Sequence, residues 1–557
     1  MEILAVIPAR GGSKGIPRKN IRLLNGKPLI YYQLKNALKS KYIDDIVVTS
    51  DDEDILDYAS NYDVYLRKRP SELAKDDVTL DPVIYDAVNY MENMLMKKYD
   101  IVVTLQPTSP LLRPETLDKA IRYFIENDLD TLVPVVDATH LYWREVNGKI
   151  VPDFKERLNR QYLPKKYKET GAFLISKREF IRENSRFGKK VDIFILDEIE
   201  GVDIDTPLDW LIADTLLKRL TILFVVNGNE KIGMGHIYRT ITLADRLMGH
   251  NILFLTWDSD EKALKLLKDH NYKVISTSKE NLLDVISDIK PNVVINDILD
   301  TETEYIKKLK KLGCFVVNFE DLGEGADEAH LVFNALYEKT NPKPTHKFGY
   351  EYECLNEKFY LYPPIEFREN PETLFICFGG VDQNNLTCRV LSTVPDLIKE
   401  TTIDKIIVVV GPGYRYKEEL DRIIANLEGN IKVYQNVRNM PKLMKEADIA
   451  ITSNGRTIYE LTAMGIPTIS IAQNDRETLH LFARYHPGIR YLGIACTVSD
   501  RDIIEAIKEI ANNQDLRKKM YLAQIKASKI IRQGIERVIN EIMASYWRWR
   551  NEKDQNW

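Results

Sequence analysis

The chain begins with a buried strand, a glycine-rich cationic loop and a helix, an order that few folds share. Residues 3–6 form an apolar run that predicts a buried strand, and residues 27–38 have the spacing of an amphipathic helix with Pro28 near its start. The loop between them carries three glycines and four cations: Gly11, Gly12, Gly15, Arg10, Lys14, Arg18 and Lys19. Glycines let backbone N–H groups approach phosphate oxygens, so we expect this loop to wrap a nucleoside triphosphate. It lacks the Walker A pattern, and the alternative is a solvated basic turn.

Strand-like and helix-like runs alternate after this loop. Strands are predicted at 45–50, 64–66, 100–106 and 131–136, and helices at 53–59, 81–96 and 114–126. This rhythm indicates an α/β fold of the Rossmann-like kind, with a parallel sheet and helices on both of its faces. Ligands of such sheets bind beyond the carboxyl ends of the strands, so the loops that follow strands are the candidate site.

Two of these loops carry suitable side chains. Residues 105–113 read LQPTSPLLR, where Gln106 offers an amide and Thr108 and Ser109 offer hydroxyls, although a proline-rich turn without a ligand is the alternative. Residues 67–76 carry Arg69, which could hold phosphate or lie in an exposed charged loop.

Two aspartates close the first half of the chain. Asp203 and Asp205 alternate along a predicted extended strand, so their carboxylates should point to the same side. Carboxylates that converge beside a triphosphate need a cation, and Mg²⁺ prefers such ligands. The alternative for Asp205, or for Thr206, is a cap on the helix that begins at Pro207.

Together these stretches resemble the acylneuraminate cytidylyltransferases, which make CMP-sialic acids from CTP. Residues 9–20 fit that family's A-R-x-x-S-K-G-x-P-x-K-N, and the R-P-x-E-L-A-x-D and D-x-D-T motifs follow, as does L-Q-P-T-S-P-L-R with one extra Leu before Arg113. The resemblance implies catalytic roles for Arg10 and Lys19, nucleotide contacts from Ala9, Arg10, Gly11, Gly12, Ser13, Asn20 and Arg69, substrate contacts from Gln106, Thr108, Ser109 and Thr170, and Mg²⁺ ligands in Asp203 and Asp205. Thr170 stands where family members often carry Asn, which leaves open whether the sugar acid is of the sialic, legionaminic or pseudaminic type. The family also implies that residues 137–170, rich in aromatic side chains, form an arm that makes a homodimer and helps close the sugar site.

A second unit is predicted after residue 219. Residues 207–219 form a closing helix and residues 221–226 start a fresh strand, which gives domains at 1–219 and 220–557. The second domain has two sets of strands, joined by a proline-rich break, and therefore two lobes at about 220–365 and 372–545. Three of its glycine loops follow strands and precede helices, at 233–239, 378–382 and 453–460, where phosphate can bind.

The second half resembles the UDP-sugar hydrolase of pseudaminic acid biosynthesis, a relative of the MurG-type glycosyltransferases with the two-lobed GT-B fold. The resemblance rests on GMGHIYR at 233–239, FGGVD at 378–382 and the 453–460 stretch. It implies that His236 is the general base that activates water. It also implies nucleotide contacts from Gly379, Gly380, Asn454, Gly455 and Glu460. A glycosyltransferase or a non-catalytic nucleotide-binding module are the alternatives, and the tail at 546–550 is predicted to be a frayed end.

The amino-acid composition argues against several classes of protein. A net charge of −5 gives no case for nucleic-acid binding, and the five cysteines form no C-x-x-C pair that would indicate zinc or a disulfide framework. No apolar run approaches the ~20 residues of a membrane helix, and no signal pattern precedes the first strand. We therefore expect a bifunctional cytoplasmic enzyme that uses CTP, a nonulosonic acid and a UDP-sugar as substrates.

Overall fold

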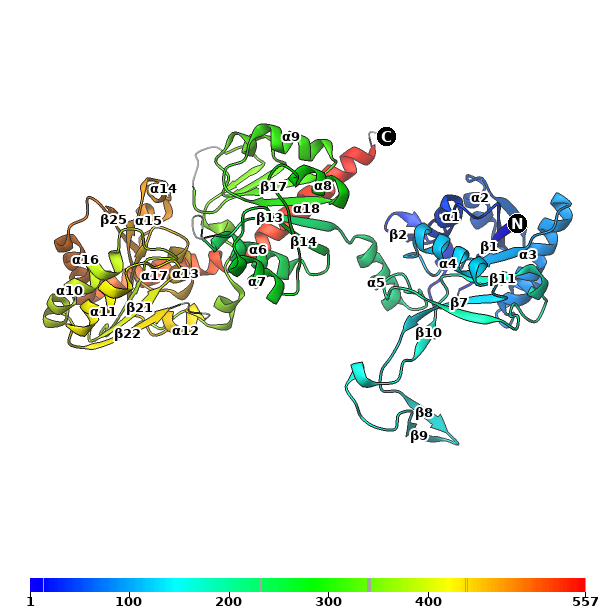
Figure 1. Cartoon of the computed structure of the whole chain (residues 1–557), viewed down its shortest axis with the longest axis horizontal. Coiled ribbons are helices and arrows are strands. Elements are labelled where there is room, and N and C mark those ends of the chain that lie inside the picture. Colours follow the sequence, from blue (N-terminus) through cyan, green and yellow to red (C-terminus); the bar gives the residue numbers. More distant parts are fainter. Residues whose placement is uncertain (14, 230–232, 338–341, 436, 438, 556–557) are drawn as a thin grey trace. The chain divides into compact units, whose positions relative to one another are not determined.

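The chain forms two compact units, Met1–Arg219 and Leu220–Trp557 (Figure 1). The computed structural model describes all residues except 14, 230–232, 338–341, 436, 438 and 556–557, so Lys14 of the cationic loop lies outside the described residues. Among the helices it describes, none combines the length and apolar character that a bilayer crossing requires. Each unit is described by itself below.

The first unit is built on an eight-stranded sheet in the order β10-β7-β11-β6-β1-β4-β5, with β12 beside β7. Its strands are β1 (Ile3–Pro8), β4 (Asp45–Ser50), β5 (Tyr65–Lys68), β6 (Ile101–Thr104), β7 (Thr131–Asp137), β10 (Tyr167–Glu169), β11 (Leu174–Lys177) and β12 (Val191–Ile195). The strands β6, β1, β4 and β5 run parallel, but β10 and β11 run antiparallel to β7. The sheet is therefore parallel at its centre, as predicted, and β10 and β11 add antiparallel pairings that the sequence analysis did not foresee. No crossover helix separates β7 from β10, and strands joined without one run antiparallel.

Helices cover both faces of this sheet, as predicted. Alternate β1 residues such as Ile3 and Ile7 pack with α1 (Ile30–Lys39) and α4 (Pro114–Glu126), while Leu4 and Val6 pack with α3 (Leu80–Leu95). A fully buried strand that feeds two cores must be apolar at every position, which explains the run at the start of the sequence. The helix expected from residue 27 begins only at Ile30, because β3 (Lys27–Pro28) pairs with β2 (Leu23–Leu24) in a short hairpin.

An arm leaves the first unit after β7. Its tip is the hairpin of β8 (Trp143–Val146) and β9 (Lys149–Pro152), which extends away from the sheet and returns through β10 (Figure 1). Trp143 and Ile150 on the hairpin are 56% and 65% exposed, and Tyr162 further along the arm is 69% exposed. Apolar side chains of this size on a projecting hairpin are typical of a surface that meets another protein.

Two parallel sheets form the second unit. The first has the order β15-β14-β13-β16-β17-β18-β19 and the second the order β22-β21-β20-β23-β24-β25. The first contains β13 (Thr221–Val226), β14 (Asn251–Thr256), β15 (Lys273–Ser276), β16 (Val293–Asp297), β17 (Phe315–Phe319), β18 (Leu331–Asn334) and β19 (His346–Phe348). The second contains β20 (Thr373–Cys377), β21 (Lys405–Val410), β22 (Asn430–Gln435), β23 (Ile449–Ser453), β24 (Thr468–Ala472) and β25 (Ile489–Ile494). Both predicted lobes are therefore parallel α/β layers.

The chain returns to the first lobe at its C-terminal end. After α16 (Asp500–Asn512) and α17 (Gln514–Ile531) of the second lobe, α18 (Gly534–Gln555) packs onto the core around β13 and β17. Tyr546 is only 3% exposed, and the ring of Trp549 lies 5.5 Å from that of Phe315. The prediction of a frayed tail at 546–550 is wrong, because the aromatic side chains that give it an unusual composition are the ones that bury it.

Candidate active sites

The parallel strand order reverses at one point in each of the three sheets. These points lie between β1 and β6, between β13 and β16, and between β20 and β23. Connections leave such neighbouring strands in opposite directions, and the crevice beyond their carboxyl ends is the usual ligand site of open α/β sheets. All the sequence motifs described above that follow β1, β6, β13, β20 and β23 begin at these points.

Contacts from the cationic loop of the first unit tie it to its neighbours. Nη1 of Arg10 lies 3.0 Å from Oδ1 of Asp76, and the Gly11 N–H donates to Asp51 at 3.1 Å. The side-chain amide of Asn20 donates to the carbonyl of Arg10 at 2.9 Å and thereby fixes the loop from within. The loop after β1 therefore meets both the loop after β4 and the 67–76 motif.

Lys19 joins the same loop to the aspartate motif. Its ammonium donates to the carbonyl of Ile204 and lies 3.4 Å from Oδ1 of Asp205, although the side chain is only 11% exposed. Gly15 passes so close that a Cβ there would lie 2.4 Å from the Asp205 carbonyl oxygen. Only glycine permits this approach, so its position is explained by the meeting of two loops that lie 190 residues apart in the sequence.

Asp203 has the features of a ligand for a cation. Its Oδ1 is buried without a hydrogen-bond partner among the described residues, and a Cβ at Gly171 would approach its carboxylate oxygens to 3.0 Å. A buried acceptor without a donor is costly unless a ligand supplies the missing interaction. These carboxylate oxygens are therefore suitable ligands for Mg²⁺. Within the described residues no three His, Cys, Asp or Glu side chains could hold a metal alone, so substrate oxygens would have to complete the shell.

Thr206, and not Asp205, is the residue that caps the helix after the aspartate motif. Thr206 caps α5 (Pro207–Leu217) in a reciprocal capping box with Asp209, so Asp205 has no capping task. Residues 201–205 form a turn and an irregular segment, and the prediction that both aspartates alternate along a strand is wrong.

Arg69 lies on the same side as the cationic loop and is 6% exposed. Its Nη2 donates to the carbonyl of Thr49 at 2.9 Å. Burial lowers the pKa of Arg69, the carboxylate of Asp51 counteracts this, and the positive charge of Arg10 lowers it further. Two guanidinium groups that repel each other in a partly buried place are a feature of an anion site.

The remaining predicted residues of the first unit line the loops after β1, β6 and β10. The Ala9 N–H is used by the Thr49 carbonyl at 3.0 Å, whereas Gly12 and Ser13 are more open and could offer backbone donors to phosphate. The carbonyl of Thr108 accepts from Ile204 at 2.8 Å, which fastens this loop to the aspartate motif.

Three of the side chains that are predicted to contact the sugar acid are buried or half-buried. Gln106 is half-buried, Oγ of Ser109 is buried with no partner in the part of the chain that the structure describes, and Thr170 is buried. Arg113, after the extra Leu, forms an ion pair with buried Glu200, directly before the aspartate motif. It therefore contacts the residue that directly precedes the 201–205 segment.

His236 of the second unit is paired with a carboxylate that the sequence analysis did not single out. It lies at the start of α6 (Gly235–Arg246), and its Nδ1 is 2.5 Å from Oδ1 of Asp297, the last residue of β16. Burial alone would raise the pKa of Asp297, but the charges and hydrogen bonds of Arg239 and His236 outweigh it and hold the pKa well below its usual range. The carboxylate must accept, so Nδ1 carries the hydrogen, and in the neutral tautomer Nε2 keeps a lone pair.

Arg239 supports this pair from one turn further along α6. Its Nε donates to Asp297 at 2.6 Å, and its Nη1 donates to Glu320 at 3.0 Å. Asp297 is fully buried and is the last residue of β16, so its place at a strand end was the signal that could have identified it.

The 378–382 and 453–460 loops of the second lobe lie side by side, since a Cβ at Gly379 would be 3.6 Å from Oγ of Ser453. Gly379 has φ +79°, which favours glycine, and a Cβ at Gly411 would lie 2.4 Å from the Gly380 carbonyl oxygen. Gly455 lies at the start of α13 (Thr457–Met464), next to Ser453. The N–H of Asn454 and its side-chain amide are used by Glu477 and His480 within the lobe. Asn454 therefore shapes this loop, while Gly379, Gly380 and Gly455 leave backbone accessible.

Glu460 lies one turn inside α13 and is half-buried. Burial, and after it the charge of Glu353, raise its pKa to about 7. Such a carboxyl can accept hydrogen bonds from hydroxyl groups at neutral pH, and a perturbed pKa at a strand-order reversal is typical of functional sites.

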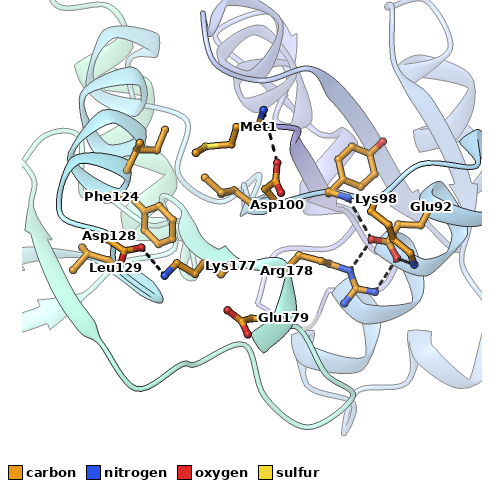
Figure 2. Close-up of a pocket in the computed structure, with 13 residues that line it drawn as sticks. Met1, Glu92, Lys98, Asp100, Phe124, Asp128, Leu129, Lys177, Arg178 and Glu179 are labelled. Carbon is orange, nitrogen blue, oxygen red and sulfur yellow. Dashed lines mark hydrogen bonds and ion pairs between the residues drawn. The ribbon is translucent and has the colours of Figure 1, made fainter.

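A pocket of about 760 Å³ in the first unit lies elsewhere (Figure 2). It lies at the amino ends of β1 and β6, whereas the sequence motifs follow the carboxyl ends of the strands. Five of its charged side chains pair with one another: Lys98 and Arg178 with Glu92, at 2.8 and 3.0 Å, and Lys177 with Asp128 at 2.8 Å. Because these side chains pair within the pocket and no sequence motif lines it, we interpret it as part of the structural framework of the unit.

Comparison with known proteins assigns the first unit. Residues 4–196 match the cytidylyltransferase family model. Over 226 residues the chain is 35% identical to the pseudaminic acid cytidylyltransferase of Campylobacter jejuni, an alignment that covers 39% of this chain and 97% of that protein. The CMP-N,N'-diacetyllegionaminic acid synthase of Legionella pneumophila is 33% identical over 229 residues, covering 39% and 97%. The N-terminal unit is a nucleotidyltransferase of the acylneuraminate type. The chain belongs, through this unit, to the cytidylyltransferase family.

The second unit is assigned more coarsely. Residues 373–538 match the glycosyltransferase family 28 C-terminal domain. The chain is also 34% identical, over 276 residues, to an uncharacterized protein of Methanocaldococcus jannaschii, a match that spans 46% of this chain and 56% of that protein and assigns a reaction to neither unit. A crystal structure of Acinetobacter baumannii MurG aligns with 58% of this chain and 99% of its own, at 15% identity and a TM-score of 0.44. The family match thus places the second lobe among GT-B-like domains without specifying its reaction.

Proposed function

We propose that the first unit transfers CMP from CTP to a nonulosonic acid and releases pyrophosphate. The observation that carries this proposal is that the cationic loop contacts the 67–76 motif through Arg10 and Asp76, the loop after β4 through Gly11 and Asp51, and the aspartate motif through Lys19 and Asp205. The relatives named as pseudaminic acid and legionaminic acid enzymes support the substrate class.

In this proposal a hydroxyl oxygen of the sugar acid forms the new bond to the α-phosphorus, the bond to the pyrophosphate breaks, and the hydroxyl proton is lost. Arg10, Lys19 and Arg69 would bind and orient the phosphates and offset their charge. Asp203 and Asp205 would hold Mg²⁺, which supplies charge neutralisation when bound. Gln106, Thr108, Ser109 and Thr170 would orient the base and the sugar.

The test is product analysis. Full-length protein is incubated with CTP and Mg²⁺ and, in separate reactions, a sialic, a legionaminic and a pseudaminic acid. A CMP-linked mass with one acid, and pyrophosphate release that needs both substrates, would support the proposal and name the sugar. Pyrophosphate release without any of the three acids would reject the substrate class.

For the second unit, the proposal is hydrolysis of a UDP-linked diacetamido sugar. The supporting observation is the His236–Asp297 pair, because Asp297 leaves Nε2 of His236 able to take a proton from water. Backbone N–H groups of Gly379, Gly380 and Gly455 would hold the diphosphate, and Glu460 would accept from ribose hydroxyls. UDP release in water without an acceptor tests this. Release only after an acceptor is added would favour a glycosyltransferase, and UDP binding without turnover would favour a nucleotide-binding module.

The two reactions would serve one route, in which hydrolysis frees an amino sugar, a condensation with a three-carbon unit follows, and CMP transfer activates the resulting nine-carbon acid. The exposed arm with Trp143 and Ile150 would join two copies of the first unit in a homodimer. We place the enzyme in the cytoplasm, where CTP and UDP-sugars are available.

A further inference from the structure

A continuous row of charged side chains connects the two lobes of the second unit. It begins at His236 in the first lobe, reaches Arg456, which directly follows the 453–455 loop of the second lobe, and returns to Glu353 of the first lobe. Its successive contacts are His236–Asp297 at 2.5 Å, Asp297–Arg239 at 2.6 Å, Arg239–Glu320 at 3.0 Å, Glu320–Arg456 at 3.6 Å and Arg456–Glu353. Each link is an ion pair or a charge-assisted hydrogen bond in a largely buried setting, where such contacts are strong.

Arg456 is the only member of this row that comes from the second lobe. Its backbone is the N-cap of α13, directly after Gly455. Its guanidinium pairs with Glu320 and Glu353 of the first lobe, both of which are only 4% exposed. The side chain itself is 25% exposed, so an anion at the 453–455 loop could reach it.

Glu320 is held in an unusual way for a purely structural residue. Its φ is +51°, a left-handed conformation that is strained for a glutamate. Its Oε2 is buried with no hydrogen-bond partner in the described chain, and Oε2 of Glu353 and Nη1 of Arg456 share this property. A strained backbone and incomplete pairing destabilise a fold, and they are retained where a site needs them.

We infer that Arg456 is a positioning residue for His236, which makes the second lobe's nucleotide loop and the first lobe's base act as one site. This inference rests on the proposed hydrolysis. When the diphosphate of the UDP-sugar occupies the 453–455 loop, it competes with Glu353 and Glu320 for Arg456. Through Glu320, Arg239 and Asp297 this changes the orientation of the His236 ring. His236 is therefore oriented to take a proton from water only when the nucleotide is bound.

The first measurement is UDP release by full-length Arg456→Gln. We expect kcat to fall roughly 10-fold or more with a smaller change in KM, and Arg456→Lys to restore part of it. Arg476→Gln is the matched control, because Arg476 also reaches from the second lobe to the first, with Nε 2.9 Å from the Tyr337 hydroxyl and Nη2 3.4 Å from Asp300. In a His236→Ala background, Arg456→Gln should have no further effect. An equal loss in the Arg476 variant, or a full additional loss without His236, would overturn the inference.

The second measurement needs no hydrolysis, so it separates this inference from the proposed function. UDP affinity is measured by calorimetry for the wild type, Arg456→Gln, Glu320→Gln and the double variant, with thermal unfolding as a check that each is folded. Coupled residues should depart from additivity by at least about threefold. Additive changes in UDP affinity would overturn the link between Arg456 and Glu320. Non-additive changes in affinity, together with a wild type that releases no UDP, would reject hydrolysis and keep the link. If Glu320→Gln does not fold, Glu353→Gln replaces it in the same cycle.

Discussion

Asp203→Asn should abolish CMP transfer without destabilising the protein. In the wild type, Oδ1 of Asp203 is buried with no partner among the described residues, a situation that costs about 1–3 kcal/mol when no ligand relieves it. The amide has almost the same shape and carries no charge. The free energy of unfolding should therefore stay constant or rise by about 1 kcal/mol, which raises Tm by roughly 2–4 °C in a unit of this size.

The activity should move in the opposite direction. A cation that the carboxylate holds supplies several kcal/mol of charge stabilisation in the transition state. Because about 1.4 kcal/mol corresponds to a tenfold change in rate, CMP transfer should fall by about 100-fold or more. Pyrophosphate release at ordinary Mg²⁺ levels measures this, and calorimetry on the full-length chain, in the transition that CTP shifts, measures stability.

Asp209 is the matched control, six residues after Asp203 and in the first turn of α5. Its Oδ2 accepts from the Thr206 N–H and hydroxyl, both at 2.8 Å, and from the Asp205 N–H at 3.1 Å. Asp209→Ala should therefore lower stability by about 1–2 kcal/mol while leaving more activity than Asp203→Asn. If Asp203→Asn lost stability as Asp209→Ala does, or kept near-normal activity, Asp203 would be a structural residue.

Three further predictions concern other parts of the chain. Residues 1–219 expressed alone should be a folded, active cytidylyltransferase, because all four motifs and both cores of that unit are internal to it; an inactive fragment beside an active full chain would refute this. Since burial and the charge of Glu353 raise the pKa of Glu460 from 4.5 to about 7, the unfolded state loses this proton more readily, and the second unit should lose stability as pH rises from 4.5 to 7. Glu460→Gln should flatten that slope in Tm against pH, and an unchanged slope would assign it to another group. Trp143→Glu with Ile150→Glu should convert a dimer to a monomer in light scattering, and an unchanged mass would exclude the arm as the dimer contact.

Regular elements were predictable where one physical signal decided them. The strands at 45–50 and 221–226 and the helices at 53–59 and 114–126 have the predicted bounds, because buried parallel strands are largely apolar and these helices have clear ends. The helix after the cationic loop was placed too early, since hairpin pairing took Lys27 and Pro28. The tail at 546–550 was mistaken for a frayed end because local composition does not reveal a surface supplied by another lobe.

The candidate sites were predictable in position and less so in composition. Glycine loops after strands located the three reversal points, but the partners Asp297 and Glu320 come from strand ends whose neighbours are set by sheet order. Asn454 was predicted to bind nucleotide, and the structure uses its amide inside the loop, because its partners Glu477 and His480 follow on a later segment. Long-range pairing of this kind leaves no pattern in the sequence.

The central claim is that one chain carries two independent active sites, and reciprocal inactivation tests it most directly. Asp203→Asn and His236→Ala are each assayed, as full-length proteins, for CMP transfer and for UDP release in water. The account predicts that Asp203→Asn loses CMP transfer and keeps UDP release. It also predicts that His236→Ala keeps CMP transfer and loses UDP release by ~100- to 10,000-fold, as for removal of a general base. A His236→Ala protein that releases UDP as fast as the wild type would contradict the account, as would a single variant that loses both activities while folded.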